Sequence, residues 1–81
     1  MSREAEMFGA ALKRWREKRG LTQEGLAHKA GISASYASHV ERGEKVPTLT
    51  IILRLAGALN ISASQLLSDF DTTEIKRLRF D

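Results

Sequence analysis

Residues 21–43 contain two short helical patterns, each opened by a hydroxyl residue and closed by a glycine. Thr22 opens the first pattern and Gly31 closes it, while Ser33 opens the second and Gly43 closes it. A hydroxyl at the N-cap accepts a hydrogen bond from an amide that has no partner inside the helix, and glycine suits the residue after a helix end. The segment therefore predicts two helices joined by a tight turn.

An apolar residue stands directly before each cap, at Leu21 and at Ile32. Their spacing from Leu26 and Ala37 fits a hydrophobic staple, which fixes the angle at which the chain enters a helix. Helices of about eight residues are not stable alone, so the pair needs a scaffold to pack on. This combination indicates a helix-turn-helix, whose second helix is shaped to enter a DNA major groove.

The composition fits one small domain with an aliphatic core. The chain has 81 residues, of which 42% are apolar, with one Trp, one Tyr and three Phe. It has no Cys, which excludes a disulfide framework and a thiolate metal site. No apolar run approaches the roughly 20 residues of a membrane span, and residues 1–6 do not resemble a signal peptide. We therefore expect a cytoplasmic protein that does not bind a membrane.

The positive charge is concentrated in one half of the chain. The net charge is +3, but residues 13–45 hold eight basic and four acidic side chains. A basic surplus on one face is the electrostatic footprint of phosphate binding. The alternative is that these Lys and Arg residues only solvate a small protein.

Apolar spacing predicts an all-α fold, a compact bundle of five helices within one domain spanning residues 1–81. The expected helices span residues 4–19, 22–30, 33–42, 49–60 and 63–68, with Thr48 and Ser62 as further caps. A last turn is expected to begin at Thr72 or Thr73. The expected core consists of Phe8, Leu12, Trp15, Leu21, Leu26, Ala27, Ile32, Ala37, Val40, Leu49, Ile52, Leu53, Ala56, Leu59, Ile61 and Leu66.

Four motifs together resemble the Xre-type, lambda-repressor-like helix-turn-helix family. They are GLTQEGLA at 20–27, AGIS at 30–33, SYASHVERG at 35–43 and PTLTIILRLAGAL at 47–59. The resemblance covers residues 8–67 and implies a five-helix DNA-binding domain. Chains of this type without a second domain resemble Cro-like repressors, restriction–modification controller proteins and some antitoxins. The family usually has Glu at the position of Gly25, so the capping box of the second helix is incomplete here.

The recognition helix, about Ser33–Arg42, is expected to read bases with its outward side. Its outward positions hold small or polar residues, and Tyr36 lies at the margin. The resemblance places Ala34, Ser35, Tyr36 and His39 at base-reading positions. The predicted base contacts are Ala34, Ser35, Tyr36, Ser38 and His39. Since none of these is Arg, Asn or Gln, specificity would depend on His39, on Tyr36 and on DNA deformability. The alternatives are a solvated His39 and a Tyr36 that packs on the second helix.

Phosphate contacts are expected at the flanks of this helix, from residues able to donate hydrogen bonds or positive charge. The predicted contacts are Gln23, Ser33, Arg42, Lys45 and Thr48. The resemblance further implies that Arg16 and Glu41 form a partly buried ion pair with a structural role. Two His residues without Cys do not make a metal site by spacing, and no cofactor or small-molecule ligand is expected.

The expected partner is a pseudo-palindromic duplex operator bound by a homodimer. The fourth helix is apolar on more than one side, and exposed apolar surface usually marks an interface. The predicted dimer residues are Ile51, Leu55, Ala58, Leu66 and Phe70. The alternative is that residues 69–81 fold back over Ile51 and Leu55 within one chain.

Competing functions have weaker support from the sequence. There is no Gly-rich phosphate loop, no Ser–His–Asp order and no paired carboxylates on one apolar helix face, so an enzyme is not expected. Single-stranded RNA binding would need exposed aromatic platforms, which the sequence does not indicate. The main alternative to a transcriptional regulator is a DNA-binding antitoxin that also binds a toxin through residues 69–81.

Overall fold

A computed structural model describes residues 2–80 of the chain. Within these residues, six helices follow one another. The described part of the chain contains no strand, which confirms the all-α prediction. Their bounds are α1 (Arg3–Lys18), α2 (Gln23–Ala30), α3 (Ala34–Glu41), α4 (Leu49–Leu59), α5 (Ala63–Leu66) and α6 (Thr72–Arg77). The sixth helix corresponds to the last turn expected from the sequence.

Each helix begins where a short polar side chain accepts the amide of the third helical residue. The predicted caps are all present: Thr22 accepts from Gly25, Ser33 from Tyr36, Thr48 from Ile51 and Ser62 from Gln65. Ser2 caps α1, which begins at Arg3, one residue before the expected start. α6 begins at Thr72, as expected, and Asp71 caps it.

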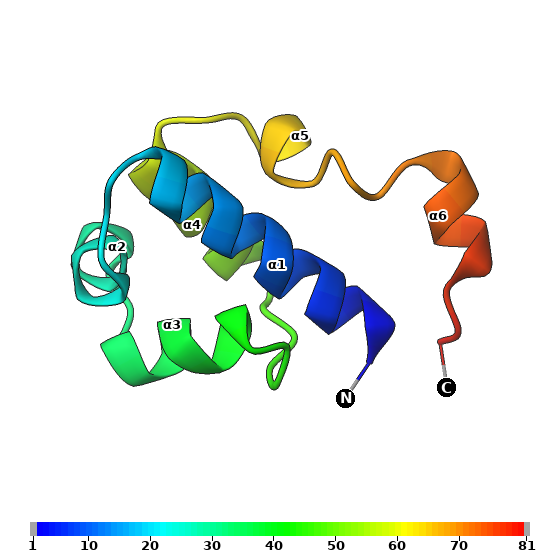
Figure 1. The fold of residues 1–81 in the computed structure, drawn as a ribbon, viewed down its shortest axis with the longest axis horizontal. Helices are drawn as coiled ribbons and strands as arrows, with labels where there is room; N and C mark the ends of the chain where they lie inside the picture. Colours follow the sequence, from blue (N-terminus) through cyan, green and yellow to red (C-terminus); the bar gives the residue numbers. More distant parts are fainter. Residues whose placement is uncertain (1, 81) are drawn as a thin grey trace.

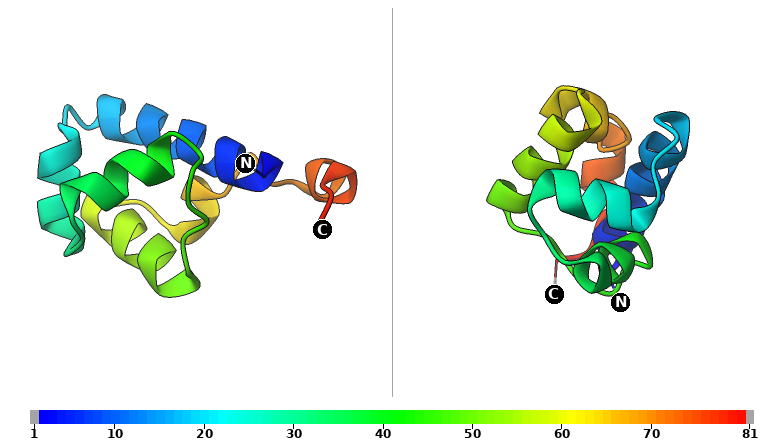
Figure 2. Two further views of the ribbon diagram at one scale, coloured as in Figure 1. Left: turned by 90° about the horizontal axis from the view of Figure 1, so that it is seen from below. Right: turned by 90° about the vertical axis from the view of Figure 1, so that its left-hand side faces the viewer.

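α1 crosses the middle of the molecule (Figure 1) and packs against α3 and α5. α3 packs on α1 and α2, while α4 packs on α2 and α5. Figure 2 shows α6 set apart from this group, at one end of the molecule. A contact of 3.6 Å between Arg3 and Glu74 and the burial of Leu78 connect α6 to the rest.

The aliphatic core lies between α1, α2, α3, α4 and α5. Its largest fully buried side chains are Leu12, Leu26, Val40, Leu55, Leu59 and Leu66. Trp15, Leu21, Ile32, Ile52 and Ile61 are partly buried and pack against this cluster. Most of the predicted core is therefore confirmed.

The prediction was wrong about the buried face of α4. Leu49 and Leu53 were expected in the core, but they are 68% and 51% exposed. Leu55 was expected on the surface and is fully buried. Because α4 is apolar on both faces, its sequence does not define which face turns inward. The buried face is set by packing of α4 against α2 and α5, which places Leu55 in the core.

Candidate nucleic-acid interface

The turn between α2 and α3 is built by Gly31 and Ser33. Gly31 has a φ of 73°, a left-handed conformation that glycine adopts without a steric penalty. The Ile32 amide then donates to the Ala27 carbonyl at 3.0 Å, and Ser33 caps the new helix three residues after Ala30, the last residue of α2. This short connection fixes α3 across the end of α2, as in a helix-turn-helix (Figure 1).

α3 turns one side to the core and leaves the other in contact with solvent. Ala37 and Val40 are fully buried. Ser35 is exposed, and the other predicted base-contacting residues, Ala34, Tyr36, Ser38 and His39, are half-buried. The five predicted base-contacting residues therefore all keep some surface accessible. Tyr36 also packs against the hydrophobic core.

Arg16 and Glu41 form a two-point ion pair that joins α1 to α3. Arg16 Nε lies 2.6 Å and Nη2 3.1 Å from the two Glu41 oxygens, and the side chains are only 12% and 3% exposed. Arg16 also donates to the Leu21 carbonyl, and the Gln23 amide donates to Glu41 at 3.0 Å. The hydrogen bond with Glu41 raises the pKa of Arg16 above its ordinary value. This network fixes the start of α2 against α3.

Gln23 therefore has a contact that the sequence did not indicate. Its side chain was predicted to meet a phosphate, and the structure places its amide nitrogen on Glu41. The signal for this contact was absent from the sequence, because the two residues lie 18 positions apart.

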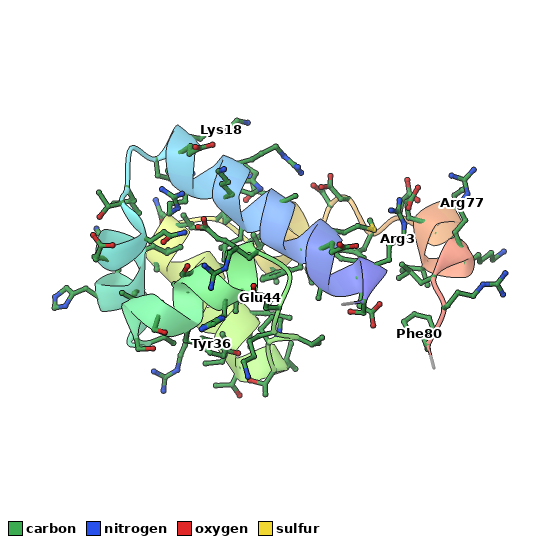
Figure 3. The ribbon with its side chains drawn as sticks, turned by 60° about the horizontal axis from the view of Figure 1, so that its bottom comes forward. Arg3, Lys18, Tyr36, Glu44, Arg77 and Phe80 are labelled. Atoms are coloured by element: carbon green, nitrogen blue, oxygen red, sulfur yellow. The ribbon has the colours of Figure 1, made fainter. Side chains whose placement is uncertain are left out.

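A second polar cluster lies where α3 ends, and its central member, Glu44, was missed by sequence reasoning. One Glu44 oxygen lies 2.6 Å from His39 Nδ1 and 3.1 Å from Arg42 Nη2. The His39 hydrogen bond is the main cause that lowers the pKa of Glu44 below its ordinary value. Gly43, with a φ of 76°, turns the chain back so that the Glu44 amide donates to the His39 carbonyl. Figure 3 shows Tyr36 on α3 and Glu44 in the loop that follows it.

The remaining predicted phosphate contacts lie at helix starts and in the loop before α4. Ser33 and Thr48 use their hydroxyls as helix caps. Ser33 accepts a hydrogen bond from the Tyr36 amide at 3.0 Å, and Thr48 accepts one from the Ile51 amide at 3.2 Å. Lys45 is exposed and has no carboxylate within ion-pair distance in residues 2–80. Lys45 and Arg42 thus place two positive charges beside the end of α3.

Several basic residues of the first half have partners inside the fold. Arg14 pairs with Asp69, and Arg16 pairs with Glu41. Arg19 donates to the Leu59 carbonyl at 2.9 Å and so caps the end of α4. The basic surplus read from the sequence is therefore partly structural. Beside the end of α3, Arg42 is itself paired with Glu44, and Lys45 adds a second cation.

The predicted dimer residues do not form one exposed surface. Leu55 and Leu66 are fully buried within the chain, so this part of the prediction was wrong. Ile51, Ala58 and Phe70 are half-buried and pack against the core. The exposed apolar residues of this region are instead Val46, Leu49 and Leu53, which we call the α4 patch. Val46 also borders a groove of about 170 Å³ that Pro47, Leu67 and Phe70 help to line.

Among residues 2–80, no helix is long and apolar enough to cross a membrane.

Comparisons with known proteins agree with this geometry. The helix-turn-helix family HTH_3 matches residues 12–66, which include α2, α3 and the network that joins them. The chain is 44% identical over 63 residues to the uncharacterized HTH-type transcriptional regulator YazB of Bacillus subtilis, a match covering 78% of this chain and 91% of that protein.

Two solved structures of restriction-modification controller proteins are also similar. C.AhdI from Aeromonas hydrophila is 41% identical, with a TM-score of 0.76, over 78% of this chain and 91% of that one. C.Esp1396I is 25% identical, with a TM-score of 0.81, over 95% of this chain and 99% of that one.

The fold and its exposed α3 define a helix-turn-helix protein, a class that acts by binding DNA and not by catalysis. The chain belongs to the Xre-type, lambda-repressor-like HTH_3 family, and it is a DNA-binding transcriptional regulator.

Proposed function

We propose that the chain binds a specific, pseudo-palindromic duplex operator as a two-fold homodimer, in the manner of a restriction-modification controller or a Cro-like repressor. The observation that carries this proposal is the half-exposed side of α3, with Arg42 and Lys45 beside its end. A helix presented in this way can enter a major groove while the flanking cations meet phosphates. Two similar proteins are restriction-modification controllers, which supports a regulator of this type. The place of action would be the cytoplasm.

The two kinds of contact would be divided along the chain. Ser35 and His39, with Ala34, Tyr36 and Ser38, would meet base edges, where a serine hydroxyl and a methyl group discriminate only modestly. Arg42, Lys45, Ser33 and Thr48 would meet the DNA backbone, together with the N–H groups at the N-terminal ends of α2 and α3. Gln23, whose side-chain amide is held by Glu41, would contribute through the N-terminus of α2. Such contacts position the protein and make binding salt-dependent.

A homodimer is proposed because the α4 patch leaves three large apolar side chains in water. Val46, Leu49 and Leu53 are 65%, 68% and 51% exposed. Leu49 and Leu53 are four residues apart on one helix, so their side chains are neighbours. The apolar groove bordered by Val46 continues this surface toward Phe70, one of the predicted dimer residues. Pairing would also place two copies of α3 on successive half-sites, about 34 Å apart.

Selection from a random duplex library tests the proposal. We expect the parent to enrich a two-fold symmetric motif, and Ser35→Glu to lose binding because a carboxylate would then face the DNA. Ser64→Glu, which changes an exposed serine of α5 in the same way, is the matched control and should bind like the parent. Failure of the parent to enrich any duplex motif would overturn the proposal. The antitoxin alternative stays an untested prediction.

A further inference from the structure

His39 is the one predicted base-contacting side chain that is held by a second side chain. Its Nδ1 lies 2.6 Å from Glu44 Oε1, and the His39 and Glu44 side chains are 39% and 40% exposed. Nε2 of the same ring has no partner in residues 2–80. The ring therefore offers one nitrogen to Glu44 and keeps the other free for a partner outside the chain.

The contact with Glu44 decides which ring nitrogen carries the proton. An ionised carboxylate only accepts hydrogen bonds, so Nδ1 must donate to it. On a neutral imidazole, a proton on Nδ1 leaves Nε2 with a lone pair and makes it an acceptor. Without Glu44, Nε2 is free to carry the proton instead and to act as a donor.

The difference between acceptor and donor matters in the major groove. An acceptor pairs with the exocyclic amino group of adenine or cytosine, whereas a donor pairs with N7 or O6 of guanine, with N7 of adenine or with O4 of thymine. Cytosine therefore discriminates most clearly between the two, because its major-groove edge offers only a donor. Arg42 Nη2 lies 3.1 Å from the Glu44 oxygen and 3.3 Å from His39 Nδ1, so the guanidinium stands beside the ring on the Nδ1 side. Its charge lies beside Nδ1 and adds no donor at Nε2.

We propose that Glu44 is a positioning residue that determines sequence specificity: it fixes His39 with Nε2 as an acceptor, which selects an amino-bearing base, adenine or cytosine. This inference rests on the proposed function, since it assigns the reading of one operator position. Glu44 itself need not touch DNA. Its negative charge beside Arg42 should also weaken phosphate binding equally for all sequences.

The test compares selected motifs and relative affinities of the parent, His39→Ala, Glu44→Ala and Glu44→Gln, at about pH 8.5, where an ordinary imidazole is neutral. We expect the parent to select adenine or cytosine at one position of each half-site, and His39→Ala to lose that preference. Glu44→Ala should reduce the same preference about tenfold. Glu44→Gln should restore it, because the Gln carbonyl still accepts from Nδ1–H.

Charge and positioning are separable in these variants. Glu44→Ala and Glu44→Gln both remove the negative charge, so both should bind every sequence more tightly, but only Glu44→Ala should change the preferred base. Nitrogen-15 NMR of the imidazoles gives a readout independent of binding. His39 of the parent and of Glu44→Gln should carry its proton on Nδ1, and His39 of Glu44→Ala should carry it mainly on Nε2.

The possible failures are distinct. A parent that selects no duplex motif contradicts the proposed function itself. A selected motif that Glu44→Ala leaves unchanged, a guanine or thymine preference lost with His39→Ala, or an Nε2–H tautomer in the parent would each overturn the role of Glu44 while leaving the proposed function intact. Thermal unfolding of each variant shows whether it is folded at the assay temperature.

Discussion

Gly9 on α1 lies directly against the backbone of Glu41 on α3. A β-carbon on Gly9 would lie 2.5 Å from the Glu41 carbonyl oxygen and equally close to that of Val40. Only the missing side chain permits this approach, which places α3 where Arg16 of α1 reaches the Glu41 carboxylate at 2.6 Å. The position of the recognition helix therefore depends on one glycine in the scaffold helix.

Gly9→Ala should destabilise the fold. The added methyl group would meet backbone atoms, which cannot rotate away, so α1 and α3 must separate; overpacking of this kind costs about 1–3 kcal/mol or more. Urea unfolding measures the change. Gly57→Ala in α4 is the control, because a β-carbon there meets nothing within 4 Å. It should stabilise by about 0.5–1 kcal/mol through helix propensity. Equal effects of the two variants would contradict this account.

How much the sequence predicted depends on how far apart the interacting groups are. The caps at Thr22 and Ser33 were predictable, since each accepts an amide only three residues away. The contact of Gly9 with Glu41 was not predictable, because nothing in the neighbouring sequence marks which glycine allows two helices to approach closely. Glu44 was missed because its contact with His39 requires the chain to reverse at Gly43, which no periodicity indicates.

Glu41→Gln should unfold at a lower denaturant concentration than the parent. Glu41 accepts two bonds from Arg16 and one from Gln23, and its side chain is only 3% exposed. Neutralising it leaves the Arg16 charge poorly solvated, which costs about 3 kcal/mol. Asp69→Asn, which breaks the exposed pair with Arg14, should cost less than about 1 kcal/mol. Equal unfolding midpoints for Glu41→Gln and the parent would show that the pair contributes nothing.

Arg42→Ala should weaken binding to all duplex sequences by a similar factor. Its guanidinium is exposed beside the end of α3 and would neutralise about one phosphate, so the slope of log affinity against log salt should fall by about one. Arg77→Ala on α6, remote from α3, should leave the slope unchanged (Figure 3). Titrations at several salt concentrations measure both slopes. A changed base preference in Arg42→Ala would contradict a backbone role.

The contacts of Glu44 should stabilise the fold in a manner that depends on pH. Its pKa is lowered from an ordinary value of 4.5, chiefly by the His39 hydrogen bond. A lowered pKa means that the stabilisation is fully present above 4.5 and is lost as pH falls through the lower folded value. The difference in unfolding free energy between the parent and Glu44→Gln should therefore shrink below about pH 4.5. A difference independent of pH across the acid range would count against the contact.

Leu53→Glu should prevent dimerisation without unfolding the chain. Leu53 is 51% exposed in the single chain, so a carboxylate there remains solvated in the monomer. In a two-fold dimer the substitution occurs on both sides of the interface and removes two apolar contacts. Each buried leucine contributes about 1.5–3 kcal/mol, so the dimer dissociation constant should rise by about a hundredfold or more.

Ala10→Glu on α1 is the matched control, since it adds the same charge at an exposed position outside the α4 patch. Equilibrium sedimentation at micromolar concentrations should show dimers for the parent and Ala10→Glu, and monomers for Leu53→Glu. The same monomeric variant should bind a duplex with two half-sites no better than one with a single half-site, because each recognition helix then acts alone. A parent that stays monomeric, or a Leu53→Glu dimer as stable as that of Ala10→Glu, would place the interface away from the α4 patch.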